Sequence, residues 1–174
     1  MKHPKLYEIN TVAWLYELSQ KYGDRFSIGN VPSKEWDGLK ESGFHYIWLM
    51  GIWKRSQEGR RYFQTDPRYR PLYDTVLPGW KEEDIIGSPY SVASYEPDPI
   101  MGDWQDLDRV LEELHKRNMK LVLDFVPNHT GPDHPWVKDH PEYYIQGSED
   151  DFRRNPAAFF QAQHKGKAFF IAKG

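Results

Sequence analysis

The 174-residue sequence contains no cysteine, which excludes disulfide bonds, thiolate nucleophiles and zinc–thiolate sites. It also lacks any apolar run that approaches the roughly 20 residues of a membrane-spanning helix. The formal net charge is only −3, so no strong positive field favours nucleic acid or an anionic membrane surface. The first ten residues, MKHPKLYEIN, contain no apolar segment typical of a secretory signal. We therefore expect a soluble, cytoplasmic chain with no nucleic-acid partner and no membrane partner.

Aromatic residues, by contrast, are abundant and make up 16% of the chain, with seven Trp and eleven Tyr. Two interpretations are open. Sugar-binding clefts use aromatic rings as flat platforms, whereas well-packed cores use them for their large contact area. Composition alone favours the core, because aromatic side chains dominate core energetics in proteins generally.

The hydrophobic pattern predicts strands that alternate with helices. Strands are expected at residues 6–10, 45–51 and 121–126, and helices at residues 11–22, 33–43 and 104–117. Thr11 and Ser33 are the predicted N-caps of the first two helices, and Gly23 is a predicted stop signal. Residues 54–86 contain charges, prolines and scattered aromatics, and they read as a long loop. The alternation predicts an α/β fold with a parallel sheet.

The third helix carries the clearest signals of the chain. Asp103 is its predicted N-cap, with Asp106 three residues later in a capping-box arrangement. The apolar residues recur at helical spacing and form one stripe, Leu107, Val110, Leu111 and Leu114.

Residues 121–130, LVLDFVPNHT, place polar residues on and just after an apolar strand that we expect to be buried on both faces. Asp124 lies in the middle of this strand, where an ionised carboxylate is costly unless a cation or hydrogen-bond donors meet it. Asn128 and His129 follow where the strand should end. Because sites in parallel α/β folds gather at the carboxyl ends of strands, these residues are site candidates. Each one taken singly also fits a turn residue or a structural ion pair.

The combination DFVPNH resembles the Asp-x-x-x-Asn-His signature on the third barrel strand of the α-amylase family, glycoside hydrolase family 13. The segment GDWQDLDRVLEELHKRNMKLVLD resembles the family's second helix and third strand, GFHYIWLMGIW its second strand, and LYEIN its first. SPYSVASYEPDP is similar to the family segment Gly-Tyr-x-x-x-Asp-Tyr, although Pro89 and Ser94 depart from it. NHTGPDHPW resembles the start of the loop domain of oligo-glucosidase, amylosucrase and trehalose synthase relatives.

The resemblance implies a partial TIM (β/α)8 barrel. Residues 1–128 would supply its first three strands and their helices, and residues 129–174 would begin the loop domain that follows strand three. A complete barrel needs roughly 250 residues, so we expect the chain to be the amino-terminal portion of a longer enzyme.

The resemblance also implies roles for four residues. His129 would hydrogen-bond the glucosyl unit at the cleaved bond, and Tyr90 would stack beneath the same ring. Asp124 would support the sugar subsite by pairing with an arginine supplied later in the sequence. Asn128 would orient the loop after the strand. Asn128 is also a candidate calcium ligand, but one carbonyl oxygen indicates calcium only weakly, because the ion takes about six to eight oxygens. No cofactor is otherwise required.

The implied activity is retaining hydrolysis of α-glucosidic bonds in an α-glucan or α-glucoside substrate. That reaction needs two carboxyl groups about 5–5.5 Å apart, and the family's nucleophile and acid lie on strands four and five. Because none of those motifs occurs here, we expect this chain to be inactive by itself. Transglycosylation or isomerisation (as in trehalose synthase) and a non-catalytic carbohydrate-binding role remain alternatives. The sequence leaves the oligomeric state open.

Overall fold

The computed structural model describes residues 3–173, which divide into two compact units. Unit 1 comprises the chain up to Lys54 together with Tyr95–Phe125, and unit 2 comprises Arg55–Ser94 together with the chain from Val126 onward. The chain passes between the units within two short paired strands, β3 (Trp53–Arg55) and β4 (Val92–Pro97). The boundary predicted between residues 128 and 129 stays a prediction.

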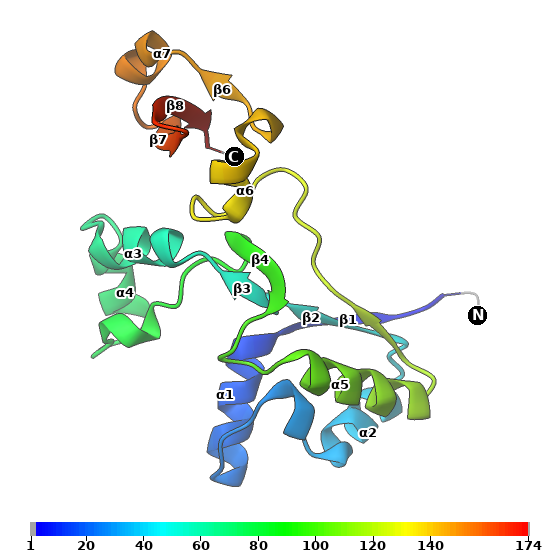
Figure 1. Cartoon of the computed structure of the whole chain (residues 1–174). Helices are drawn as coiled ribbons and strands as arrows, with labels where there is room; N and C mark the ends of the chain where they lie inside the picture. Colours follow the sequence, from blue (N-terminus) through cyan, green and yellow to red (C-terminus); the bar gives the residue numbers. More distant parts are fainter. Residues whose placement is uncertain (1–2, 174) are drawn as a thin grey trace. The chain divides into compact units, whose positions relative to one another are not determined.

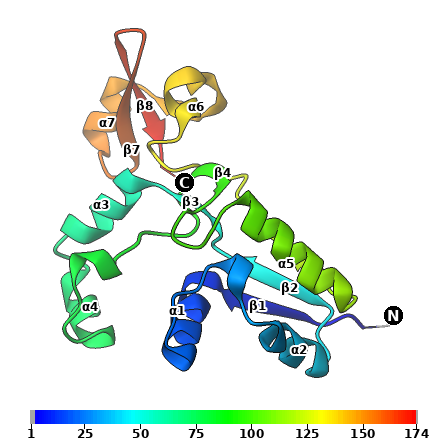
Figure 2. The same cartoon turned by 60° about the horizontal axis from the view of Figure 1, so that its bottom comes forward.

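Unit 1 contains a three-stranded parallel sheet in the order β1-β2-β5. Its strands are β1 (Leu6–Asn10), β2 (Tyr46–Met50) and β5 (Lys120–Val122). Figures 1 and 2 show β1 and β2 side by side. The sequence between β1 and β2 forms α1 (Thr11–Tyr22), the 3₁₀ turn η1 (Ile28–Asn30) and α2 (Ser33–Glu41). The helix α5 (Trp104–Lys116) precedes β5. The predicted alternation and the parallel sheet are confirmed.

The core of unit 1 lies where alternate residues of β2 meet the helices. Ile47 and Leu49 are fully buried, and in the parallel register Leu49 pairs with Ile9. Helical residues complete this core: Leu15, Leu18, Trp36, Leu107, Val110 and Leu114 are all buried. The apolar stripe predicted for α5 is therefore the face that packs inward, and α2 lies next to it (Figure 1).

The first helix is capped one residue earlier than predicted. Asn10 is the N-cap of α1, and its side-chain oxygen accepts a hydrogen bond from the N–H of Ala13 at 3.5 Å. Thr11 is instead the first helical residue, and its hydroxyl donates to the Met50 carbonyl at 2.9 Å. The Thr11 prediction was wrong because this hydroxyl is used to join α1 to the end of β2. The stop at Gly23 is confirmed, with a left-handed φ of 71°.

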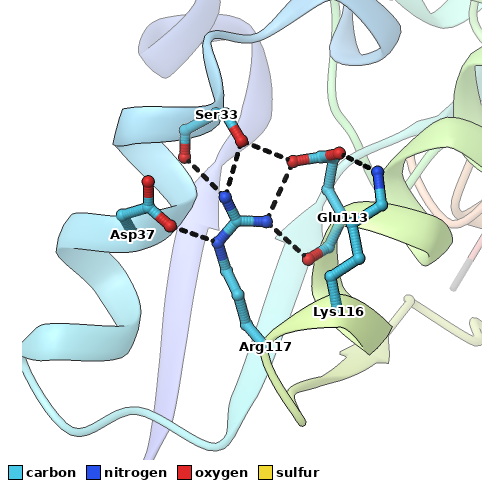
Figure 3. A network of polar contacts seen from close by, with 5 residues as sticks. All are labelled: Ser33, Asp37, Glu113, Lys116 and Arg117. Atoms are coloured by element: carbon cyan, nitrogen blue, oxygen red, sulfur yellow. Dashed lines mark hydrogen bonds and ion pairs between the residues drawn. The ribbon is translucent and has the colours of Figure 1, made fainter.

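Ser33 is also not the cap that the sequence suggested, since the N-cap position of α2 is occupied by Pro32. The Ser33 hydroxyl donates to Glu113 Oε2 on α5 at 2.9 Å. Arg117 completes the link between the two helices (Figure 3). Its guanidinium donates to Glu113 Oε2 at 2.9 Å, to Asp37 Oδ1 at 2.7 Å and to the Ser33 hydroxyl at 2.6 Å. A polar network, rather than a simple cap, thus joins α2 to α5.

The capping box of α5 agrees with the prediction. Asp103 accepts a hydrogen bond from the N–H of Asp106 at 2.9 Å, and the Asp106 side chain accepts one in return from the N–H of Asp103 at 3.3 Å. Two of the N–H groups that a helix start leaves without partners are thereby satisfied.

The strand predicted at residues 121–126 is shorter than expected, because the ladder of β5 ends at Val122. The expectation that both of its faces are buried was also wrong. Leu121, Val122 and Leu123 are only half-buried, and the Phe125 side chain is 77% exposed. Phe125 lies beyond the last paired residue, so no neighbouring strand covers it.

Residues 54–86 are largely helical rather than an irregular loop. They form α3 (Gln57–Thr65), α4 (Arg70–Val76) and the 3₁₀ turn η2 (Glu82–Asp84). The scattered aromatics of this segment contact one another in succession: Tyr62, Phe63, Tyr69, Tyr73 and Trp80, with ring centroids 5.0–6.2 Å apart. This small aromatic cluster explains how two helices form in a sequence so rich in charge and proline.

The remainder of unit 2 is a second small α/β arrangement. It contains α6 (Pro135–Asp139), the 3₁₀ turn η3 (Pro141–Tyr143), β6 (Gln146–Gly147), α7 (Glu149–Arg154), β7 (Phe159–His164) and β8 (Lys167–Ala172). The strands pair antiparallel in the order β6-β8-β7. Figure 2 shows the β7–β8 hairpin flanked by α6 and α7. In the part of the chain that the structure describes, no helix has the length and apolar character needed to cross a membrane.

Candidate functional site

Asp124 is held in unit 1 by N–H donors. Its side chain is buried, with 8% of the residue exposed. Oδ1 accepts a hydrogen bond from the indole N–H of Trp48 at 3.0 Å, and Oδ2 accepts one from the backbone N–H of Gly51 at 2.6 Å. The Asp124 carbonyl accepts a third bond from the indole N–H of Trp53 at 2.8 Å. These donors compensate for much of the cost of burying a carboxylate.

The geometry gives Asp124 a positioning role at the carboxyl end of the sheet. Gly51 follows β2 directly and adopts a left-handed φ of 78°, a conformation that suits glycine. Its N–H and the Trp48 indole join the end of β2 to Asp124, two residues after the end of β5. The arginine partner that the resemblance implies stays a prediction.

Asn128 and His129 lie together at a pocket in unit 2 that has a volume of about 770 Å³. The Asn128 amide nitrogen lies 3.2 Å from His129 Nδ1. The pocket wall also contains hydroxyl, carboxylate, ammonium and aromatic side chains, including Glu58, Tyr62, Thr130, Tyr143, Tyr144, Phe160 and Lys173. This mixture of apolar rings and a few polar groups is typical of sites for small polar ligands.

Tyr90 is not among the residues that line this pocket. Its side chain is exposed, with 40% of the residue accessible, and its backbone N–H donates to the Ser88 hydroxyl at 3.2 Å. The neighbouring residues Ser88 and Ser91 do line the pocket. The structure thus brings Asn128 and His129 together at one wall and places Tyr90 in a segment that contributes to the same pocket.

The loop that carries His129 is fastened to the start of α3. Asp133 Oδ2 accepts hydrogen bonds from the backbone N–H groups of Gln57 at 2.8 Å and Glu58 at 3.3 Å. The N–H of Gly131 donates to the Val92 carbonyl at 2.7 Å. A Cβ at Gly131 would lie 2.5 Å from the Cβ of Ser56, so only glycine allows this close approach. The loop and α3 therefore form one continuous wall.

On the other side of the loop, the Thr130 and Tyr144 hydroxyls lie 2.8 Å apart and share a hydrogen bond. Burial raises the pKa of Tyr144, and the bond to Thr130 offsets part of that effect. The phenol therefore stays protonated at neutral pH and can donate or accept a hydrogen bond. It ties the residue after His129 to the segment that leads into β6.

Sequence reasoning did not find the residues that α3 contributes to the pocket, Glu58, Gly59, Tyr62 and Phe63. The helix was hidden because charges and prolines around it suggested a loop. One signal was present, since Ser56 is an N-cap whose hydroxyl accepts from the N–H of Gly59 at 2.8 Å.

The role of Asn128 as a calcium ligand stays a prediction. The Asn128 amide contacts an imidazole, and calcium prefers about six to eight oxygen ligands. Among residues 3–173, no group of three or more His, Asp and Glu side chains is arranged to hold a metal.

Comparison with known proteins identifies the family. Residues 31–170 match the family model described as Alpha amylase, catalytic domain. The chain belongs to the alpha-amylase family. As an alpha-amylase family chain it is 34% identical over 117 residues to the oligo-1,6-glucosidase of Parageobacillus thermoglucosidasius, a match that covers 63% of this chain and 16% of that protein. It is 36% identical over 139 residues to the alpha-glucosidase of Apis mellifera, which covers 75% of this chain and 20% of that protein.

Solved structures of the family share the fold. The maltogenic alpha-amylase AmyB of Thermotoga neapolitana superimposes with a TM-score of 0.56 and 22% identity, over 98% of this chain and 32% of that one. The fold is thus that of a partial (β/α)8 barrel, with β1, β2 and β5 as parallel strands. This alpha-amylase family chain spans only 16–20% of the length of the two glucosidases named above.

Proposed function

We propose that this chain is the amino-terminal part of a retaining glycosidase that acts on α-glucosidic bonds of glucans or oligosaccharides. In this proposal, His129 donates hydrogen bonds to the glucosyl unit at the cleaved bond, and Asn128 orients His129. Asp124 maintains the carboxyl end of the sheet from which the loop with His129 departs, and Tyr90 stacks against the glucosyl ring. The two catalytic carboxylates lie in sequence beyond this segment.

The observation that most supports this proposal is that Asn128 and His129 line the same pocket. They do so in a chain that matches the alpha-amylase catalytic domain. The imidazole Nδ1 lies beside the Asn128 amide, so a neutral ring accepts there and keeps its Nε2–H as a donor. A hydrogen bond from His129 to a hydroxyl of the glucosyl unit can strengthen as charge develops on the sugar ring. Such a bond lowers the barrier to cleavage of the glucosidic bond.

The first test compares the product of the complete source gene with the 174-residue chain. We expect the complete product to hydrolyse p-nitrophenyl α-glucoside and the chain alone to be inactive. If the purified 174-residue chain hydrolyses the substrate, and replacing one of its own Asp or Glu residues abolishes this turnover, the proposal that the catalytic carboxylates lie outside this segment is contradicted. A complete product without any action on α-glucosides would instead favour a non-catalytic carbohydrate-binding role.

The second test concerns His129 in the complete product. His129→Ala should lower kcat/KM by roughly 10- to 1000-fold with little loss of stability, because it removes bonds that strengthen in the transition state. His115→Ala is the matched control, since His115 is an exposed residue at the end of α5. Equal effects of the two substitutions would count against the assigned role of His129.

A further inference from the structure

The pocket at His129 has room for more than one sugar ring. Its volume of about 770 Å³ lies in the upper part of the range of roughly 300–1,000 Å³ that is usual for ligand pockets. Two of the segments that line it are the loop with Asn128 and His129 and the helix α3. If one ring binds at His129, α3 is a neighbouring surface available to the next ring.

The pocket side of α3 presents a carboxylate and an aromatic ring one helical turn apart. Glu58 and Tyr62 are four residues apart in sequence, so they project from the same face of the helix. The Asp133 carboxylate accepts hydrogen bonds from the backbone N–H groups of Gln57 and Glu58 in the first turn of α3. The start of α3 is therefore tied to the loop that carries His129 by hydrogen bonds to the Asp133 side chain.

The Tyr62 ring is oriented before any ligand binds. Arg68 Nη2 donates to the Tyr62 hydroxyl at 2.5 Å and to Asp66 Oδ2 at 2.6 Å. The rings of Phe63 and Tyr69 contact Tyr62 edge-on, at centroid distances of 5.6 and 6.2 Å. The residue nevertheless remains 47% exposed. An aromatic ring held in this way loses little conformational freedom when a sugar stacks on it.

We propose that Glu58 and Tyr62 form the subsite for the second ring of the substrate, and that they select α-linked di- and oligosaccharides over single glucosyl units. Tyr62 stacks on the apolar face of that ring, and the Glu58 carboxylate accepts hydrogen bonds from its hydroxyls. Bonds to an ionised acceptor are stronger than those between neutral groups. This inference rests on the proposed function, because it needs the first ring at His129.

The experiment measures the affinity of the complete gene product for glucose and for a sulfur-linked maltose analogue that resists cleavage, by isothermal titration calorimetry. Tyr62→Ala and Glu58→Gln should each weaken binding of the maltose analogue by about 3- to 10-fold, which corresponds to one stacking contact or one hydrogen bond. Binding of glucose should not change.

Two controls separate a local from a general effect. Tyr16→Ala and Glu17→Gln replace the same residue types at exposed positions of α1, and neither should alter affinity for either sugar. Tyr62→Phe keeps the ring in its aromatic cluster and should retain most of the affinity for the maltose analogue. Glu58 is exposed, so the Gln substitution tests the subsite even if Tyr62→Ala disturbs α3.

The outcomes distinguish this inference from the proposed function. A product that binds neither sugar overturns the function and the subsite together. If the maltose analogue binds but the Tyr62 and Glu58 variants behave like the controls, the subsite is wrong and the function stands. If the substitutions weaken the binding of glucose and of the maltose analogue equally, the assignment of Glu58 and Tyr62 to the second ring is likewise overturned.

Discussion

At the scale of single residues, Asp124 shows how a carboxylate is tolerated at the end of an apolar strand. Its two oxygens accept from the Trp48 indole and the Gly51 backbone, both of which would lose their acceptor if the side chain were removed. An orphaned buried donor costs about 1–3 kcal/mol. Asp124→Ala in the complete gene product should therefore lower the free energy of unfolding by about 2–4 kcal/mol.

Urea unfolding followed by Trp fluorescence measures this effect, and Asp108→Ala on the exposed side of α5 is the control. Asp124→Asn keeps one acceptor oxygen and the side-chain volume, so its cost should be smaller. A loss at Asp124→Ala no greater than the control would show that water or another group replaces the carboxylate.

His134 is a second residue whose protonation state follows from its surroundings. It is buried, with 7% exposed, and its Nδ1 accepts from the N–H of Trp136 as the N-cap of α6. Burial lowers the pKa of His134, and the nearby Asp133 carboxylate only partly opposes this. A depressed folded pKa means that the stabilisation is complete above the ordinary pKa of about 6.5 and is lost as pH falls through the lower folded value.

We therefore expect stability to fall below about pH 6.5 in the wild type and to be less pH-dependent in His134→Asn. Asparagine can still cap α6 but does not titrate, whereas His134→Ala should cost about 1 kcal/mol at neutral pH. The measurement is the free energy of unfolding between pH 5 and pH 8. Parallel pH profiles for the wild type and His134→Asn would show that His134 is not the group responsible.

At the scale of elements, the contact between α2 and α5 depends on Glu113 and Arg117 (Figure 3). Hydrogen bonds from Lys116 first, then from Ser33 and Arg117, lower the pKa of Glu113 to about 2 from an ordinary value of 4.5. The Glu113 side chain is 23% exposed, so solvent weakens these interactions. Their contribution to stability is accordingly about 1 kcal/mol.

Because the folded pKa is lowered, this contribution is complete above about pH 4.5 and is lost as pH falls towards about 2. Glu113→Gln should destabilise the protein by about 1 kcal/mol at pH 7, and the difference from wild type should narrow below pH 4.5. Glu112→Gln, at the neighbouring exposed position, should have no such effect. A difference that does not change between pH 7 and pH 3 would mean that packing, and not charge, explains the loss.

At the scale of the whole chain, several large apolar side chains remain accessible. Phe125 is 77% exposed, Ile145 80% and Val76 66%. Exposed apolar side chains favour association, and β1 has a neighbour on one side only within its sheet. We expect the purified 174-residue chain to be oligomeric, molten or insoluble.

Sedimentation velocity combined with near-UV circular dichroism tests this expectation. Phe125→Ser and Ile145→Ser should reduce association, whereas Ser148→Ala at an exposed polar position should not. A compact monomer with sharp aromatic signals and cooperative unfolding would contradict it.

The sequence by itself determined the elements whose signals are local. The stripe of α5, its Asp103 capping box and the strands β1 and β2 were predictable because side-chain periodicity and caps act within a few residues of one another. The signature from Asp124 to His129 likewise predicted the family, since it consists of consecutive residues in one segment.

Only the tertiary structure decided which partners the polar side chains find. Thr11 and Ser33 look like caps, yet their hydroxyls reach the Met50 carbonyl and the Glu113 carboxylate, residues distant in sequence. The helix α3 forms in a segment whose composition suggests a loop, because its aromatic rings pack against Tyr69, the N-cap residue of α4. Its place beside His129 follows from Asp133, about 75 residues away, which accepts hydrogen bonds from the first turn of α3. Contacts between residues so far apart leave no periodic trace in the sequence, and therefore the second wall of the pocket could not be predicted from it.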